Sequence, residues 1–155
     1  MKTKDLKFWK TIEGGKKLHY IFLQEGIFFV LTDMDKGFRG NFHAISLEEV
    51  DSVRNQFCSN LIPKTFQCSR IFKFISEVKG KENNNTKKTE MEESFLIDRL
   101  TRIAYILTGM NLLKIDKYAG SVFFTKNINF KVNLGFTLFY FVLLKRLLES
   151  KSITF

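Results

Sequence analysis

Aromatic and β-branched residues recur in short runs over the first third of the chain, a pattern typical of strands. Residues 19–23 and 26–32 are rich in Ile, Phe, Tyr and Val, and Gln24-Glu25-Gly26 lies between them. Two such runs separated by a glycine-containing break predict a β-hairpin. A shorter apolar run at residues 42–45 predicts a third strand.

Helical spacing begins directly after that run. Ser46-Leu47-Glu48-Glu49 matches a capping box, in which the serine hydroxyl and the Glu49 carboxylate each bond a free amide of the first turn. Val50, Val53 and Phe57 continue the pattern and predict a helix over residues 47–58. Pro63 suits the first turn of a second helix, which the apolar positions after it predict over residues 64–78.

The strongest helical pattern lies over residues 90–108. Thr89-Glu90-Met91-Glu92 matches a second capping box. One apolar stripe follows it, made of Leu96, Leu100, Ile103 and Leu107. Gly109 stands where a left-handed C-terminal cap is expected.

The remaining segments predict a hairpin and a terminal helix. Residues 112–115 and 121–125 are β-rich and flank a glycine-containing turn, which predicts the hairpin. Residues 134–148 predict an apolar helix, and the uncharged stretch over residues 132–144 is shorter than the roughly 20 residues that cross a bilayer. We therefore expect no membrane span and a homodimer contact through this helix, since a helix that is apolar all round is usually buried. Residues 80–88 are polar and unpatterned, and we expect a mobile connector.

These elements predict an α+β protein. Residues 1–60 would form a β-rich segment closed by a helix, and residues 61–155 a second segment that ends in the apolar helix. A chain of 155 residues can hold one domain or two very small ones, so both segments could share one core.

The charge of the chain favours an acidic partner. Lys and Arg number 25 against 16 Asp and Glu, which gives a formal net charge of +9. Two-thirds of this excess lies in residues 94–155, where nine basic and three acidic residues occur. Nucleic acid or an anionic surface fits such a distribution. Two cysteines and no apolar stretch near Met1 lead us to expect a cytoplasmic protein without a disulfide scaffold.

The stretch LIDRLTRIAYILTGMNLLKIDKYAGSVFFTKN resembles the recognition helix and wing of a winged helix-turn-helix domain. In that superfamily a helix ends at a glycine, two apolar residues lead into a strand, and a basic-tipped hairpin returns. Gly109, Leu112-Leu113 and the hairpin with its lysines stand in these places, and the resemblance covers about residues 63–127. It departs from the superfamily where the polar connector replaces a compact middle helix.

The resemblance implies a double-stranded DNA-binding protein without catalytic activity, which would act as a dimeric regulator of transcription. With the apolar stripe facing the core, Asp98, Arg99 and their neighbours would lie on the outer side of the helix, where arginine can pair with guanine edges in the major groove. Lysines of the connector and wing would meet phosphates. The side chains expected at DNA are Lys87, Lys88, Arg99, Thr101, Arg102, Tyr105, Lys114, Lys117 and Lys126.

Two other functions remain open. A small protein-interaction module, such as a phage- or plasmid-type inhibitor or an antitoxin-like partner, would use the Phe-rich N-terminal hairpin and the terminal helix as interfaces. A metal-dependent nuclease would use Glu77-Val78-Lys79 as an E-x-K element with Asp51 upstream. That motif is permissive, and [DE]-x-K occurs three times in this lysine-rich chain. The spacing of the two cysteines and two histidines matches no metal site, so we expect neither a metal nor a cofactor.

Overall fold

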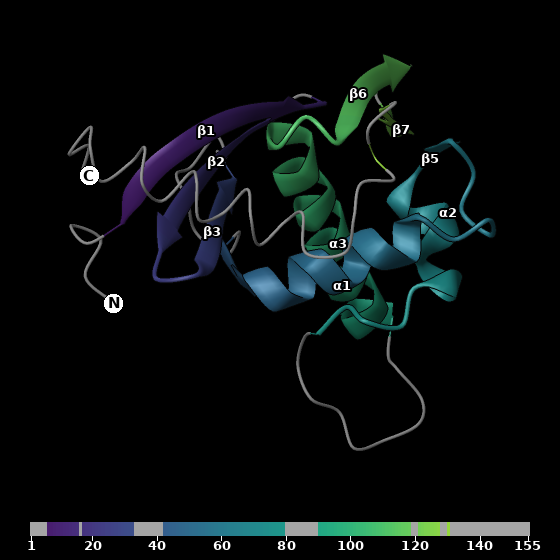
Figure 1. The fold of residues 1–155 in the computed structure, drawn as a ribbon, viewed down its shortest axis with the longest axis horizontal. Coiled ribbons are helices and arrows are strands. Elements are labelled where there is room, and N and C mark those ends of the chain that lie inside the picture. Colours follow the sequence, from purple (N-terminus) through teal and green to yellow (C-terminus); the bar gives the residue numbers. More distant parts are fainter. Residues whose placement is uncertain are drawn as a thin grey trace.

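The computed structural model describes residues 6–15, 17–32, 42–79, 90–118, 121–127 and 130. Its first sheet is antiparallel, with the strands in chain order (Figure 1). These strands are β1 (Lys7–Gly14), β2 (Lys17–Gln24), β3 (Ile27–Thr32) and β4 (Phe42–Ser46). The β2–β3 hairpin and the third predicted strand, now β4, are confirmed.

Tight turns connect the first three strands. Glu25 and Gly26 both have positive φ, 45° and 81°, as a two-residue hairpin turn of the mirror-image type I form requires. Gly15, with φ of 66°, lies in the turn between β1 and β2. The sequence did not predict β1, because Lys7, Lys10 and Thr11 interrupt its apolar residues.

Helix α1 (Leu47–Phe57) begins where the sequence predicts it. The Ser46 hydroxyl accepts a hydrogen bond from the Glu49 amide at 3.2 Å, which confirms the N-cap. The prediction that the Glu49 carboxylate bonds a free amide of the first turn is wrong. That carboxylate instead faces Arg99, 50 residues further along the chain.

The helix predicted over residues 64–78 is wrong. The chain there forms β5 (Thr65–Phe66), the short helix α2 (Cys68–Ile71), the 3-10 helix η2 (Phe72–Phe74) and then irregular chain. Phe66 pairs with Phe124 of the last strand, and its ring lies 4.9 Å from that of Phe57. This pairing holds the backbone extended at the place where a helix would have to begin.

Helix α3 (Glu90–Gly109) is followed by β6 (Leu113–Tyr118) and β7 (Ser121–Lys126), so the third helix and the second hairpin are confirmed. The second sheet has the order β5–β7–β6, in which the earliest strand pairs with the last one. In Figure 1, α3 runs between the two sheets, and it contacts β1 and β4 of the first and β6 of the second.

Gly109 does not provide the left-handed cap. Asn111 has φ of 63°, and the Asn111 and Leu112 amides bond the Thr108 and Leu107 carbonyls, as in a Schellman motif. Gly109 instead allows a close approach between α3 and β1, since a Cβ there would lie 2.7 Å from the Trp9 ring.

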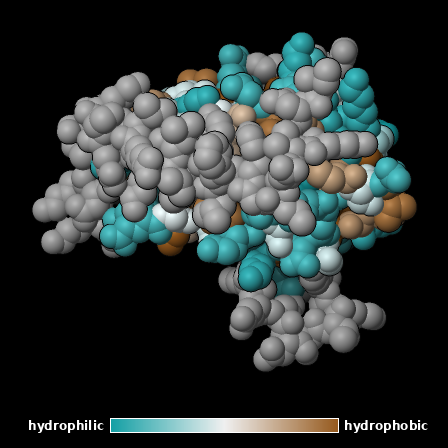
Figure 2. All heavy atoms as spheres, in the orientation of Figure 1, coloured by the Kyte–Doolittle hydropathy of each residue, from teal (hydrophilic) through white to brown (hydrophobic). Residues whose placement is uncertain are grey.

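One continuous cluster of buried apolar side chains joins both predicted segments. It includes Trp9 of the first sheet, Val53 of α1, Leu100 of α3 and Phe124 of the second sheet. Figure 2 shows that hydrophilic side chains dominate the described part of this face and that hydrophobic ones appear in small patches. Within the described ranges, no helix is long and apolar enough to span a membrane. The predicted helix over residues 134–148, its dimer contact and the whole predicted connector over residues 80–88 lie outside those ranges.

Candidate functional site

Arg99 was expected to face DNA, but it belongs to an internal ion pair between α3 and α1. Its Nε and Nη2 donate to the two carboxylate oxygens of Glu49 at 2.7 and 2.8 Å, and Nη2 also donates to the Ala44 carbonyl at 2.9 Å. The side chains of Arg99 and Glu49 are 12% and 3% exposed. The expectation that Arg99 points outward is therefore wrong.

Arg102 and Tyr105 are also internal, because the first sheet packs against their side of α3. Arg102 is 3% exposed, and its Nη1 lies 2.6 Å from Asp98 Oδ1. Its Nη2 donates to Thr32 Oγ1 at 2.7 Å. Tyr105 is 4% exposed and stacks on His19 with ring centroids 4.2 Å apart. Their predicted position on the outer side of the helix is wrong.

Thr101 does not supply an outward hydroxyl either. It is partly buried, and its Oγ1 donates to the Ile97 carbonyl one turn earlier at 2.9 Å. Of the predicted outward group, Asp98 is exposed, and its carboxylate faces back toward Arg102.

Both histidines of the chain lie beside the ion pair between Arg102 and Asp98. His19 Nδ1 lies 2.9 Å from Thr32 Oγ1, and His43 Nε2 lies 3.9 Å from Asp98 Oδ2. Burial, with a contribution from Arg102, lowers the pKa of His19 to about 4. Burial opposes ionisation of Asp98, but the nearby His43 and the ion pair with Arg102 outweigh this and lower its pKa to about 2. The network therefore joins the first sheet to α3 through a neutral His19 and a charged pair.

The exposed part of α3 is its N-terminal half, and it is acidic and apolar. Glu90 and Glu93 are exposed there, beside Met91 at 84% and Phe95 at 39% exposure. Such a face repels phosphates, so α3 does not offer the basic surface that the resemblance implies.

Three of the described lysines lie near one end of the second sheet. Lys114 is exposed on β6 and pairs across the sheet with Thr125, which pairs in turn with Thr65. Lys64 directly precedes β5 and is exposed. Its backbone carbonyl accepts a hydrogen bond from the Lys126 amide at 2.9 Å. The sequence analysis missed Lys64 because it placed this residue inside a helix.

Lys126 is held more firmly than the other two lysines. Its Nζ donates to the Ile62 carbonyl at 2.9 Å and lies 5.8 Å from the centre of the Phe130 ring. Of the remaining predicted phosphate contacts, Lys87 and Lys88 and the side chain of Lys117 lie outside what the structure describes.

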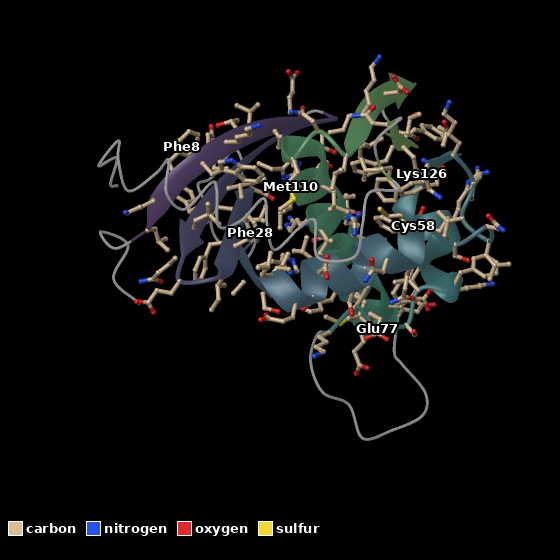
Figure 3. The ribbon with its side chains drawn as sticks, viewed as in Figure 1. Phe8, Phe28, Cys58, Glu77, Met110 and Lys126 are labelled. Atoms are coloured by element: carbon tan, nitrogen blue, oxygen red, sulfur yellow. The ribbon has the colours of Figure 1, made fainter. Side chains whose placement is uncertain are left out.

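A cavity of about 550 Å³ opens beside these lysines. Its polar lining consists of Ser59, Asn60, Lys64, Lys126 and Asn127. Its apolar lining consists of Cys58, Ile62, Pro63 and Phe130. Figure 3 shows Cys58 and Lys126 at the same end of the molecule, away from Phe8.

The other candidate chemistry finds little support in this geometry. Glu77 is exposed in irregular chain after η2, and Asp51 lies on α1 with its Oδ1 3.9 Å from Arg54. Cys68 is buried, which raises the pKa of its thiol to about 12. Among the residues that the structure describes, no three His, Cys, Asp or Glu side chains are grouped to hold a metal ion.

Comparisons with protein-family models, with curated proteins and with solved structures gave no match to this chain.

Proposed function

We propose that the chain binds double-stranded DNA through the phosphate backbone, with the lysine-bearing end of the second sheet as the contact surface. The observation that carries the proposal is the placement of three lysines at one end of the second sheet, with Lys114 on β6, Lys126 at the end of β7 and Lys64 directly before β5. The polar lining of the adjoining cavity, as far as the described residues form it, contains no carboxylate. Lysines gathered in this way can neutralise several phosphates at once.

The order of elements also supports this proposal. Helix α3 leads through Leu112 into the β6–β7 hairpin, which is the order that the resemblance to winged helix-turn-helix domains implies. Base recognition by Arg99, Arg102 and Tyr105 is not part of the proposal, because these side chains are engaged inside the protein. Phosphate contacts position a protein without reading sequence, so we expect weak discrimination between duplexes.

Fluorescence anisotropy with a labelled duplex, measured over a range of salt concentrations, tests the proposal. Affinity should fall steeply with salt, with each phosphate contact contributing about 0.9 to the slope of log K against log salt. Lys64→Gln combined with Lys114→Gln should lower that slope by about 2. Lys7→Gln is the matched control, because Lys7 begins β1 at the far end of the molecule (Figure 1).

Three results would reject the proposal. The first is a lack of duplex binding at low salt. The second is a salt slope that Lys64→Gln combined with Lys114→Gln leaves at the wild-type value. The third is a reduction of the slope by the control Lys7→Gln that is as large as the reduction by the double variant. Heparin as competitor separates duplex binding from general attraction to polyanions.

The exposed half of α3 favours protein interaction as a second candidate function. Met91 and Phe95 lie one turn apart among acidic residues, and a basic partner with an apolar centre would match them. A genuine partner should bind the wild-type chain, and Met91→Glu should abolish that binding. Ile27→Glu, which changes an exposed apolar position on β3, should leave the binding intact. Equal loss with both variants would exclude this face.

A further inference from the structure

The cavity beside Lys64 and Lys126 has the dimensions of a small-molecule site. Its volume of about 550 Å³ lies within the range of roughly 300–1,000 Å³ that is usual for such sites. A duplex meets a protein over a broad surface, whereas a concave space of this size encloses a small ligand. The proposed function uses Lys64 and Lys126 of this lining as phosphate contacts but assigns no occupant to the enclosed space. Binding of a small ligand there does not require that the chain binds DNA.

The chemistry of the lining selects for a negatively charged ligand. Two ammonium groups, Lys64 and Lys126, line the cavity together with the amides of Asn60 and Asn127. Among the residues that the structure describes, no aspartate or glutamate belongs to the lining. A phosphate monoester carries close to two negative charges at neutral pH, which equals the charge of the two lysines.

Two polar groups of the lining and the loop after α1 are held in place before any ligand arrives. Lys126 Nζ is anchored by the Ile62 carbonyl at 2.9 Å, and Asn127 Nδ2 by the Asn111 carbonyl at 2.7 Å. The loop after α1 is closed by backbone bonds from the Ile62 amide to the Ser59 carbonyl and from the Ser59 amide to the Gln56 carbonyl. Binding then costs less ordering of side chains and loop than it would at a flexible site.

We infer that this cavity binds a phosphorylated small molecule, with the phosphate between Lys64 and Lys126 and the less polar part of the ligand beside Pro63 and Cys58. Lysine is a common point-charge partner of phosphate. The apolar lining gives the remainder of such a ligand a surface that free phosphate would leave unused.

Cys58 provides the assay. It lines the cavity and is partly exposed, whereas Cys68, the other cysteine, is buried. N-ethylmaleimide should therefore modify Cys58 first, and peptide mass spectrometry distinguishes the two sites. With ligand at ten times its dissociation constant, alkylation of Cys58 should slow by about tenfold through occupancy alone.

The probes are AMP and ribose 5-phosphate, with adenosine and ribose as their phosphate-free counterparts. Protection by at least one phosphorylated probe and none by its counterpart is the expected result. Lys64→Gln should abolish that protection, and Lys114→Gln should retain it, because Lys114 does not line the cavity. The melting temperature of each variant shows whether it is folded.

The inference is overturned if neither phosphorylated probe protects Cys58, if the phosphate-free compounds protect equally, or if Lys64→Gln leaves protection unchanged. Protection by duplex DNA alone would assign the cavity to the DNA surface and likewise overturn it. A chain that binds duplex in the anisotropy assay but shows no protection refutes this inference only, and the converse result refutes only the DNA proposal.

Discussion

Breaking the ion pair between Glu49 and Arg99 should destabilise the protein far more than the loss of a surface pair. The Glu49 carboxylate accepts three bonds, two from Arg99 at 2.7 and 2.8 Å and one from the Lys79 amide at 3.2 Å. Arg99→Met removes the two shorter bonds and leaves a carboxylate that is 3% exposed without its counter-charge. Removing one partner of a buried pair costs about 3–5 kcal/mol.

A double-mutant cycle isolates this interaction. Glu49→Gln alone should also be destabilising, because it leaves the Arg99 guanidinium with the Ala44 carbonyl and no carboxylate. The double variant should be more stable than the sum of the single costs implies, by about 2–3 kcal/mol, since neither charge is then stranded. Glu48→Gln, at an exposed neighbouring position on α1, serves as the control and should change stability by less than about 0.5 kcal/mol.

Urea unfolding followed by Trp9 fluorescence and by far-UV circular dichroism measures these free energies. Trp9 is suited to this purpose because it is buried against Gly109 at the end of α3 and is the only tryptophan of the chain. A cost below about 1 kcal/mol for Arg99→Met, which is the value of an exposed pair, would refute the reasoning. Additive single costs would refute it as well.

Three further perturbations follow from the fold, and equilibrium unfolding measures each. Gly109→Ala should cost about 1–3 kcal/mol, because the new Cβ would lie 2.7 Å from the Trp9 ring; a neutral effect would contradict that close approach. Asn111→Ala should cost about 1 kcal/mol at φ of 63°, whereas Asn111→Gly should be close to neutral, and equal effects would argue against a left-handed cap. His19 stays neutral in the folded protein down to a pKa of about 4, while the unfolded chain takes up its proton near 6.5. Stability should therefore fall by up to about 3 kcal/mol as the pH drops from 6.5 to 4, and a His19→Gln variant that keeps this fall would exclude His19 as its source.

The placement of the arginines changes how DNA binding has to be tested. Charge reversal of Arg99 and Arg102 looks like a test of a recognition helix when only the sequence is considered. In the structure both residues belong to internal ion pairs, so reversal would place like charges against Glu49 and Asp98. Loss of binding in that variant would then report unfolding, and Lys64 and Lys114 are the informative positions.

Local patterns were sufficient for much of the fold. The hairpin turn at Glu25-Gly26, the N-cap of α1 at Ser46 and the apolar stripe of α3 all depend on interactions within a few residues. Periodicity and turn chemistry report such interactions directly. The α+β class and the confirmed helices and hairpins followed from them.

Contacts between distant parts of the chain decided the rest. Phe66 forms a strand because it pairs with Phe124, and Arg99 is internal because Glu49 lies opposite it. A single stripe on α3 predicts one buried face, but two sheets cover this helix, so polar residues beside the stripe are buried as well. Whether a basic side chain meets solvent or a buried carboxylate depends on what packs over it. A one-dimensional pattern does not contain that information, and only the tertiary structure supplied it.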